Sequence, residues 1–380
     1  MSKRQFLFVV ACFIQSSFLY TIYYYGSIGN EAWISFLGGI VGGILLAILY
    51  SKLCSFYPKM GLAEINKCVF GKFLGNVISV VYVATFVLSC SRLLREAGQF
   101  VAGNILIGSD WIYILIALVL LCAWASRNGV KYFSSVATFM CISLFLVTIF
   151  FFILLVPQMH LDFLLPLGKG TFVSYLKSFL LSATMPFSEL AILMTLVPEI
   201  DFSRDKSFMA RKGEKVRNRA LYDVGKKRFT IRKEFILGVI IGSAFILVTI
   251  FRDTFVLGVL LDAFSYPGYE AIRLIDYRLL SHIESLYGAA LIFLMFFKSA
   301  LIFYCITKIL ADVFECKKNV VFSAFLVGVV VLVSENMWES NIQLRSFVVN
   351  YVPYILLAVN VGLPLVSVVI SAVKGRLNKV

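Results

Sequence analysis

The sequence predicts an all-α polytopic membrane protein with ten transmembrane helices. Hydrophobic residues make up 60% of its 380 residues and charged residues only 15%, whereas an ordinary soluble domain is about 25% charged. The mean hydropathy is +0.91. One soluble globule cannot bury this much apolar surface, so the composition excludes a soluble enzyme and a disordered chain.

Ten segments are apolar over the length that a bilayer requires, roughly 17–25 residues per helix. Two of them, 111–126 and 319–334, are short, but basic residues flank both and can extend to the lipid headgroups. The chain is therefore expected to form a single transmembrane domain (1–380). The predicted helices are 6–25, 32–50, 74–99, 111–126, 132–156, 172–198, 235–251, 286–310, 319–334 and 346–373.

The distribution of Lys and Arg predicts the orientation of the chain. If there are ten spans and both termini are cytoplasmic, 26 of the 35 basic residues lie on the cytoplasmic side, as the positive-inside rule expects. Twelve of them fall in the segment 199–234. We interpret this segment as a basic cytoplasmic loop that touches anionic lipid headgroups. A nucleic-acid partner is not expected on a membrane protein.

The segment 252–285 is expected to lie on the outer side. Its apolar stretch 255–264 is too short to span a bilayer, and a turn signal follows at Tyr266-Pro267-Gly268. Apolar residues then recur at helical spacing over 271–286. The pattern predicts an outer helical hairpin that caps a vestibule.

Cysteine and histidine residues give no sign of a catalytic or metal centre. The eight Cys and two His lack the spacing typical of metal ligands. No acid–base pair or nucleophile motif is evident. The sequence therefore predicts no metal, no cofactor and no enzyme.

Lys298 is the most costly polar residue of the predicted spans. A charged side chain at the centre of a span costs about 2.5 to 3.5 kcal/mol on insertion scales and is expected to face a cavity or a partner. Lys298 lies about twelve residues, roughly 18 Å, from either end of its helix, too far to reach the headgroups easily. It is either a structural lysine held by helix-end carbonyls or a cation, fixed or titratable, in a binding cavity. Its neighbour Ser299 is a further candidate.

The sixth predicted span is interrupted by a proline. Pro186 removes a backbone donor and clashes with the preceding turn, and a broken helix in lipid survives only where it lines protein or water. The break is either a simple kink, with Glu189 bonded to a neighbouring helix, or a discontinuous helix that binds a ligand. The candidate residues are Thr184, Pro186, Phe187, Ser188 and Glu189.

The third predicted span has polar residues on one face. Arg92, Glu96 and Gln99 follow one another at i, i+4 and i+7. An Arg92–Glu96 pair would lower the cost of burial. For these three residues, an anchoring role in the outer leaflet and a role in lining a cavity are equally favoured.

The first predicted span has polar residues midway along it, at Gln15, Ser16 and Ser17. Such residues more often serve helix packing than ligand binding. However, spans one and six are corresponding members of a 5+5 arrangement, and interrupted helices at matching positions point to an inverted-repeat transporter site. This inference rests on analogy, since no direct similarity between the two halves is visible.

With these features in place, the chain resembles the B subunit of spore germinant receptors, a family similar to permeases of the amino acid–polyamine–organocation superfamily. No single motif is decisive, but their order and spacing together are fairly specific. The matching stretches are AWIS (32–35), YPKMGLAEI (57–65), FGKFLG (70–75), LREAGQFV (94–101), LLPLGKG (164–170), MPFSEL (185–190), RDTFVLG (252–258), YPGYEAIRLI (266–275) and the FFKSALIFY run around Lys298.

The resemblance implies a LeuT-like fold with helices 1 and 6 unwound, located in the inner membrane of a bacterial spore. It also implies assembly with an A subunit and a lipoprotein C subunit, and binding of a small germinant, often an amino acid. In that fold the eighth helix adjoins the unwound first helix, where sodium-coupled relatives hold a cation. We hypothesise that the ammonium of Lys298 replaces that ion.

The chain departs from the family pattern at three places. Ser16 stands where relatives carry Gly, Ser109-Asp110 where they carry Thr-Pro, and Gln99 where an acidic residue is frequent. These departures weaken the carry-over of ligand contacts on the first and third helices.

Two functions remain open because both need the same fold and site: a germinant receptor subunit, which the resemblance favours, and a proton-coupled amino-acid or polyamine permease. A membrane scaffold without a ligand ranks last, because it does not explain costly polar groups in three spans.

Overall fold

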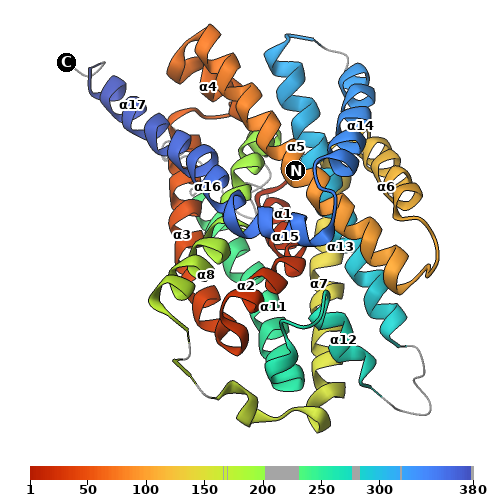
Figure 1. Cartoon of the computed structure of the whole chain (residues 1–380). Helices are drawn as coiled ribbons and strands as arrows, with labels where there is room; N and C mark the ends of the chain where they lie inside the picture. Colours follow the sequence, from red (N-terminus) through yellow and green to blue (C-terminus); the bar gives the residue numbers. More distant parts are fainter. Residues whose placement is uncertain (166, 169, 202–230, 276–282, 317–318, 378–380) are drawn as a thin grey trace, which may run out of the picture.

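The structure, a computed structural model of the chain, describes residues 1–165, 167–168, 170–201, 231–275, 283–316 and 319–377. Most of the predicted basic loop 199–234 therefore lies outside the described residues. Among those residues every regular element is helical (Figure 1), so the predicted all-α class is confirmed.

Five long α-helices form the frame of the molecule (Figure 1): α3 (Ala32–Phe56), α5 (Lys72–Asn104), α7 (Gly129–Leu155), α11 (Arg232–Leu257) and α13 (Glu284–Val313). Shorter α-helices connect and cover them: α4 (Leu62–Phe70), α6 (Trp111–Ser126), α12 (Pro267–Arg273), α14 (Asn319–Asn336), α15 (Asn341–Asn350), α16 (Val352–Leu356) and α17 (Leu363–Leu377). Single turns of 3₁₀-helix follow α2 (Thr21–Ile28) at η2 (Gly29–Glu31), α7 at η3 (Val156–Gln158) and then η4 (Leu161–Leu164), and α11 at η6 (Gly258–Leu260).

Three helical stretches change geometry along their length. The first runs as α1 (Lys3–Gln15), η1 (Phe18–Tyr20) and α2 (Thr21–Ile28), and another as α8 (Phe172–Thr184) and the 3₁₀ segment η5 (Ser188–Glu199). The third has a π-helical segment, η7 (Leu357–Gly362), between α16 and α17. Such interruptions within a bundle require neighbours that satisfy the freed backbone groups.

The apolar helices are numerous enough for a polytopic protein. Seven helical stretches are long and apolar enough to cross a membrane, or eight if the bent pair Val321–Asn336 and Asn341–Asn350 counts as one span. The 54-residue stretch Lys3–Phe56 contains the first two predicted segments, and α6 is a shorter apolar helix. These counts cover the described residues, and the total of ten spans remains a prediction.

The outer segment 252–285 differs from the prediction in its first half. The seventh span was expected to end at residue 251, but α11 continues to Leu257 and includes Arg252 and Asp253, which are paired and fully buried. The helix ends where Gly258 adopts a φ of +53°, a conformation that favours glycine. A short helix, α12, is present in the second half, and 276–282 lies outside the described residues.

The last span also begins later than predicted. The segment 346–373 was expected to be one helix, whereas α15 forms an angle of 103° with α14 and the apolar stretch starts at Val352. Pro353 stands in the first turn of α16, where the missing N–H of proline costs no helical hydrogen bond. The proline therefore marks the start of the last span.

Helix α1 lies in the middle of the bundle and packs closely on α11 and α7 (Figure 1). Small residues on α11 allow this approach, as is common between helices in membranes. A methyl group at Gly242 would lie 2.7 Å from the backbone oxygen of Ala11 and 2.7 Å from Cβ of Ile14. The backbone of α11 therefore touches α1 directly.

We expect Gly242→Ala to destabilise the protein by about 1–3 kcal/mol, because α1 and α11 must move apart to admit the methyl group. Gly103→Ala is the matched control, since a Cβ there meets no atom within 4 Å and alanine is the better helix former. Thermal unfolding of both variants in nanodiscs measures the difference. Equal melting temperatures would contradict the close contact.

Candidate functional site

The interruptions of the first and sixth predicted helices meet in the interior. Hydroxyl groups bond back to carbonyls one turn earlier on both segments, from Ser16 to Cys12 (2.7 Å) and from Ser188 to Thr184 (2.6 Å). Such bonds bend helices, and Pro186 lies between the end of α8 and the start of η5. In both segments the α-helix gives way to a 3₁₀ segment at this place. We call this place the junction, defined by Ser17, Tyr20, Arg92, Glu189 and Lys298.

Lys298 of α13 lies at the centre of the junction. Its Nζ is 2.5 Å from Glu189 Oε2, and it donates to Ser17 Oγ at 2.7 Å and to the hydroxyl of Tyr20 at 3.2 Å. An ammonium has three donors, so all of them are used. The side chains of Lys298 and Glu189 are both 0% exposed. The ammonium thus links the first helix to η5.

Arg92 of α5 is a second buried cation at the junction. Its Nη2 donates to the Tyr20 hydroxyl at 3.0 Å and lies 3.5 Å from Glu189 Oε1. Its guanidinium also lies over the Tyr20 ring, 4.6 Å from the centroid. The Tyr20 hydroxyl in turn donates to Glu189. Two cations therefore share one carboxylate, with a tyrosine between them.

A second carboxylate lies one helical turn from Arg92. Glu96 accepts a hydrogen bond from the hydroxyl of Tyr23 and is 8% exposed. The backbone oxygen of Glu96 accepts a bond from Tyr266 of the outer segment at 3.4 Å. The polar region consequently extends from the junction toward α12.

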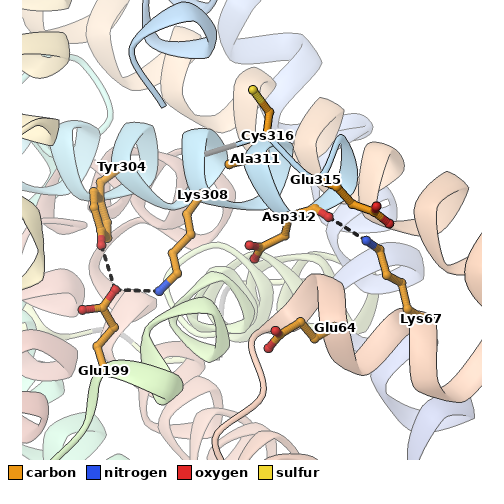
Figure 2. A pocket seen from close by; sticks show the side chains of 9 residues that line it. All are labelled: Glu64, Lys67, Glu199, Tyr304, Lys308, Ala311, Asp312, Glu315 and Cys316. Carbon is orange, nitrogen blue, oxygen red and sulfur yellow. Dashed lines mark hydrogen bonds and ion pairs between the residues drawn. The ribbon is translucent and has the colours of Figure 1, made fainter. Parts of the chain in front are cut away.

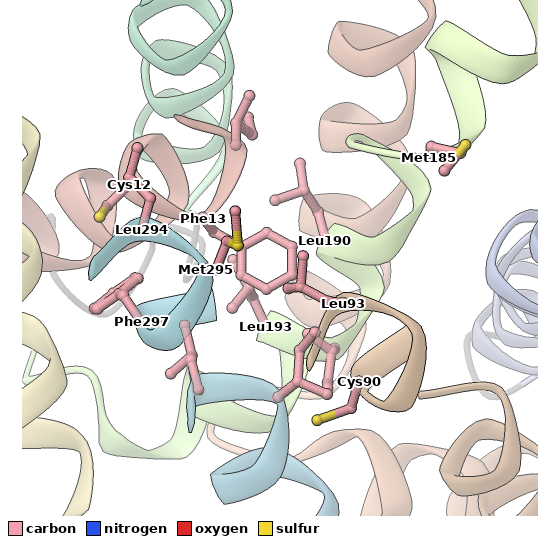
Figure 3. Close-up of a cluster of buried hydrophobic side chains, with 14 of the residues drawn as sticks. Cys12, Phe13, Cys90, Leu93, Met185, Leu190, Leu193, Leu294, Met295 and Phe297 are labelled. Atoms are coloured by element: carbon pink, nitrogen blue, oxygen red, sulfur yellow. The ribbon is translucent and has the colours of Figure 1, made fainter. Parts of the chain in front are cut away.

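Figure 3 shows a cluster of buried apolar side chains on the helical stretches that supply the junction residues. Phe13, Leu93, Leu190 and Met295 of this cluster are each 0% exposed. Lys298 Nζ also lies 4.7 Å from the centroid of Phe13. In such surroundings electrostatic interactions are stronger than in water, and an unpaired charge is correspondingly costly.

Other residues predicted for the site lie around the junction rather than in it. The amide of Gln15 donates to the carbonyl of Cys141 on α7 at 3.4 Å, and Phe187 stacks on Phe36 of α3. Gln99 is half-buried, and the hydroxyl of Ser299 is buried without a partner among the described residues. The carbonyl of Ser188 accepts from Tyr50 at 3.1 Å, and Thr184 Oγ1 bonds within α8.

Sequence reasoning did not single out the tyrosines of the junction. Tyr20 contacts Arg92, Glu189 and Lys298, and Tyr23 holds Glu96. The available signal was their spacing, because tyrosines three residues apart lie on one face of a helix, directly after the polar Ser16-Ser17.

A second Glu–Lys pair, Glu199 and Lys308, also joins η5 to α13. Each of its residues lies ten positions after its counterpart in the Glu189–Lys298 pair. Lys308 Nζ is 2.7 Å from Glu199 Oε1, with side-chain exposures of 18% and 34%. Tyr304 donates to the same oxygen at 3.1 Å, and the N-terminal amine of Met1 donates to the Glu199 carbonyl at 2.7 Å. Segments η5 and α13 therefore run parallel, with one buried pair and one accessible pair.

The accessible pair borders an open pocket of about 620 Å³. Figure 2 shows Glu199 and Lys308 at one side of it, Glu64 and Asp312 facing its middle, and Lys67 at the other side. Lys67 donates to the backbone oxygen of Asp312 at 2.6 Å. Tyr304, Ala311, Glu315 and Cys316 complete the lining.

We expect Lys308→Met to cost about 0.2–1 kcal/mol, because a partly exposed ion pair contributes little. Thermal unfolding and spore germination measure the effect, and the germination response should persist. Lys52→Met, at an exposed position, controls for the loss of one positive charge. Loss of folding in Lys308→Met alone would contradict a minor role for this pair.

A separate buried ion pair fixes the outer segment. Arg252 donates to Asp253 Oδ1 from Nε (2.8 Å) and Nη2 (2.6 Å). Nη2 also reaches the Gly268 carbonyl and the Tyr287 hydroxyl, while Tyr25 donates to Asp253 Oδ2 at 3.3 Å. This pair joins α11 to α2, α12 and α13.

Comparison of the sequence with known proteins identifies a family, and comparison of the structure identifies a fold. The family model described as "Spore germination protein" matches residues 1–214. Spore germination protein YndE of Bacillus subtilis (strain 168) is 30% identical over 89 residues, which cover 23% of this chain and 24% of that protein. The match thus spans about a quarter of the length of that curated relative.

Two solved transporters have a similar structure. Mhp1, a nucleobase–cation-symport-1 family transporter in a closed conformation with bromovinylhydantoin bound, has a TM-score of 0.67 at 10% identity, covering 95% of this chain and 77% of that one. A manganese transporter of Eremococcus coleocola, in complex with an aromatic bis-isothiourea substituted compound, has a TM-score of 0.55 at 9% identity, covering 96% and 77%. The predicted LeuT-like fold is thereby confirmed, and the apolar helices identify an integral membrane protein.

Proposed function

The chain belongs to the spore germination protein family, and on that premise we propose that it is the membrane subunit of a germinant receptor. It binds a small germinant, an amino acid, in a permease-like site at the junction and thereby triggers germination. The residues of this site are Gln15, Ser16, Ser17, Arg92, Glu96, Gln99, Thr184, Pro186, Phe187, Ser188, Glu189, Lys298 and Ser299.

The buried Lys298–Glu189 pair supports the proposal most strongly. A buried ion pair is often no more stabilising than apolar residues of similar volume, so stability alone gives little reason for one in the interior. This pair joins α13 to η5 at 2.5 Å, and Lys298 also donates to Ser17 and Tyr20 of the first helical stretch. Permeases of this fold are expected to bind their ligands at such interruptions. A ligand that binds one arrangement of the junction better than another shifts the equilibrium between them.

The germinant receptor also requires partners and a membrane. We place the chain in the inner spore membrane, with both termini cytoplasmic, in a complex with the A subunit and the lipoprotein C subunit. The segment 199–234 then faces anionic lipid, which the excess of Lys and Arg on that side favours.

A proton-coupled amino-acid or polyamine permease is the second candidate, because the structural neighbours are transporters. Uptake of labelled amino acids into liposomes that contain the chain, measured beside germination of spores that lack it, separates the two functions. Lost germination without uptake supports the receptor. Concentrative uptake with unaltered germination supports the permease and overturns the receptor.

A further inference from the structure

The segment η5 is an unusually long 3₁₀-helix. It has 12 residues, Ser188–Glu199, whereas runs longer than about three or four residues are uncommon, because the hydrogen bonds of a 3₁₀-helix are poorer than those of an α-helix. At its end, the amide of Ile200 bonds to the carbonyl of Val197 at 3.2 Å. A helix this long in its less favourable form is expected to be held by contacts outside its own backbone.

Ion pairs at both ends hold η5 against α13. At the start, Glu189 is paired with Lys298 and both side chains are 0% exposed. At the end, Glu199 is paired with Lys308 and also accepts a bond from Tyr304. The pair at the end is partly exposed, and such pairs contribute little. The end of η5 is therefore the part that is released more easily.

Between the two glutamates, η5 has no preferred face. Residues 190–197 are all apolar except Thr195, and each of them is 0% exposed. A helix that is apolar all round is suited to full burial, so a rotation about its axis exchanges one apolar contact for another. The rotation of η5 is fixed chiefly by the charged residues at its ends.

Thr195 is the polar exception, and its hydroxyl is not satisfied. Thr195 Oγ1 is buried without a partner among the described residues, and a buried hydroxyl without a partner is unfavourable. In an α-helix, a threonine hydroxyl commonly bonds to the carbonyl three or four residues earlier, which here includes that of Ala191. An α-helical form of η5 would therefore give this hydroxyl an acceptor.

Conversion to an α-helix would displace one end of η5 relative to the other. Pro198 has no N–H and its ring would clash with the carbonyl of Met194, so the α-helix would extend at most to Val197. From Glu189 to Val197, eight residue steps would shorten by about 4 Å and turn by about 160°. If Glu189 stays at the junction, Glu199 turns almost to the opposite side of the helix.

We propose that η5 is a switch that converts between a 3₁₀-helix and an α-helix, and that the Glu199–Lys308 pair holds it in the 3₁₀ form. Conversion keeps the buried pair, breaks the accessible pair and bonds the hydroxyl of Thr195. Glu199 lines the pocket of about 620 Å³, so the switch carries a change at the junction to this pocket. The proposal does not depend on which molecule the junction binds.

Distances between spin labels on the full chain in nanodiscs test the switch. One label is placed at Asp201→Cys, directly after η5, and the other at Lys52→Cys, an exposed position on α3. Lys52→Cys with Lys131→Cys, exposed on α7, is the control pair, since neither label follows η5. Cys68 and Cys316, which are exposed, are first replaced by serine. Double electron–electron resonance then measures both distances.

Two substitutions should favour the α-helical form. Lys308→Met removes the accessible pair, and Pro198→Ala removes the clash and restores the N–H. Together they should raise the population of a second distance between positions 201 and 52 by at least about tenfold. Pro198→Ala alone should act in the same direction, which keeps the test valid should the double variant fail to fold. Pro157→Ala, at an exposed proline outside η5, is the matched control and should change nothing.

Thr195→Val, added to these variants, tests the rewinding itself. Valine has the shape of threonine without the hydroxyl, so the α-helical form loses its added bond and the first distance should regain population. A single unchanged distance in Pro198→Ala and in the double variant would overturn the switch. A second distance that also appears in the control pair, or that Thr195→Val leaves unchanged, would overturn it as well, because the motion would then not be a rewinding of η5.

Discussion

Replacing Lys298 with methionine is expected to abolish the germination response while the protein remains in the membrane. The substitution removes the ammonium that joins Ser17 and Tyr20 to Glu189, so the two interrupted helices lose their link. Germination is followed by the fall in optical density of a spore suspension, and an immunoblot of spore membranes measures the amount of protein. A normal response would contradict the role of Lys298.

A second variant separates function from folding. Removal of one partner of a buried pair costs about 3–5 kcal/mol because the other charge is left uncompensated. Arg92 limits this loss, since its Nη2 remains 3.5 Å from Glu189. Lys298→Met combined with Glu189→Gln should regain stability without regaining the response. Recovery of germination in the double variant would assign the defect of Lys298→Met to folding alone.

Replacing Asp253 with alanine is expected to destabilise the protein by about 3–5 kcal/mol. The guanidinium of Arg252 would remain fully buried and would lose two hydrogen bonds to a carboxylate, which leaves an unpaired charge in the interior. Thermal unfolding of the purified protein measures the loss, and Asp262→Ala, at an exposed position, controls for the charge.

Replacing both partners tests the cause of that loss. Arg252→Met with Asp253→Leu removes both charges, so it should recover much of the stability that Asp253→Ala loses. A melting temperature of Asp253→Ala equal to that of the wild type would contradict the importance of this pair.

The fold class was predictable because long apolar segments and the placement of basic residues constrain a membrane chain. The end of α11 was not predictable in the same way, because a charged pair such as Arg252 and Asp253 is costly to bury and therefore does not indicate the continuation of an apolar helix. Both side chains are fully buried in the protein, where each neutralises the other and Tyr25 and Tyr287 complete their bonds. Sequence shows a charge, but not the partner that makes its burial possible.

The candidate site was predictable only in part, because the sequence shows which polar residues are costly to bury but not which residues they pair with. Lys298 and Glu189 were recognisable as costly residues, yet they are 109 positions apart, so their pairing depends on how the helices pack. Tyr20 was missed because a tyrosine in an apolar helix is ordinary, and its three polar contacts arise only when α5, η5 and α13 converge on it.

Hydrogen exchange at the two interrupted helices tests most directly whether a small germinant binds at the junction. The chain in nanodiscs is labelled with and without a mixture of the twenty L-amino acids, and the peptides that contain residues 12–24 and 184–200 are compared with the rest. Ligand should slow exchange in these two regions and leave the pocket near Lys308 unchanged. Exchange that is identical with and without amino acids in both regions, in protein from spores that germinate in response to them, would contradict a ligand site at the junction.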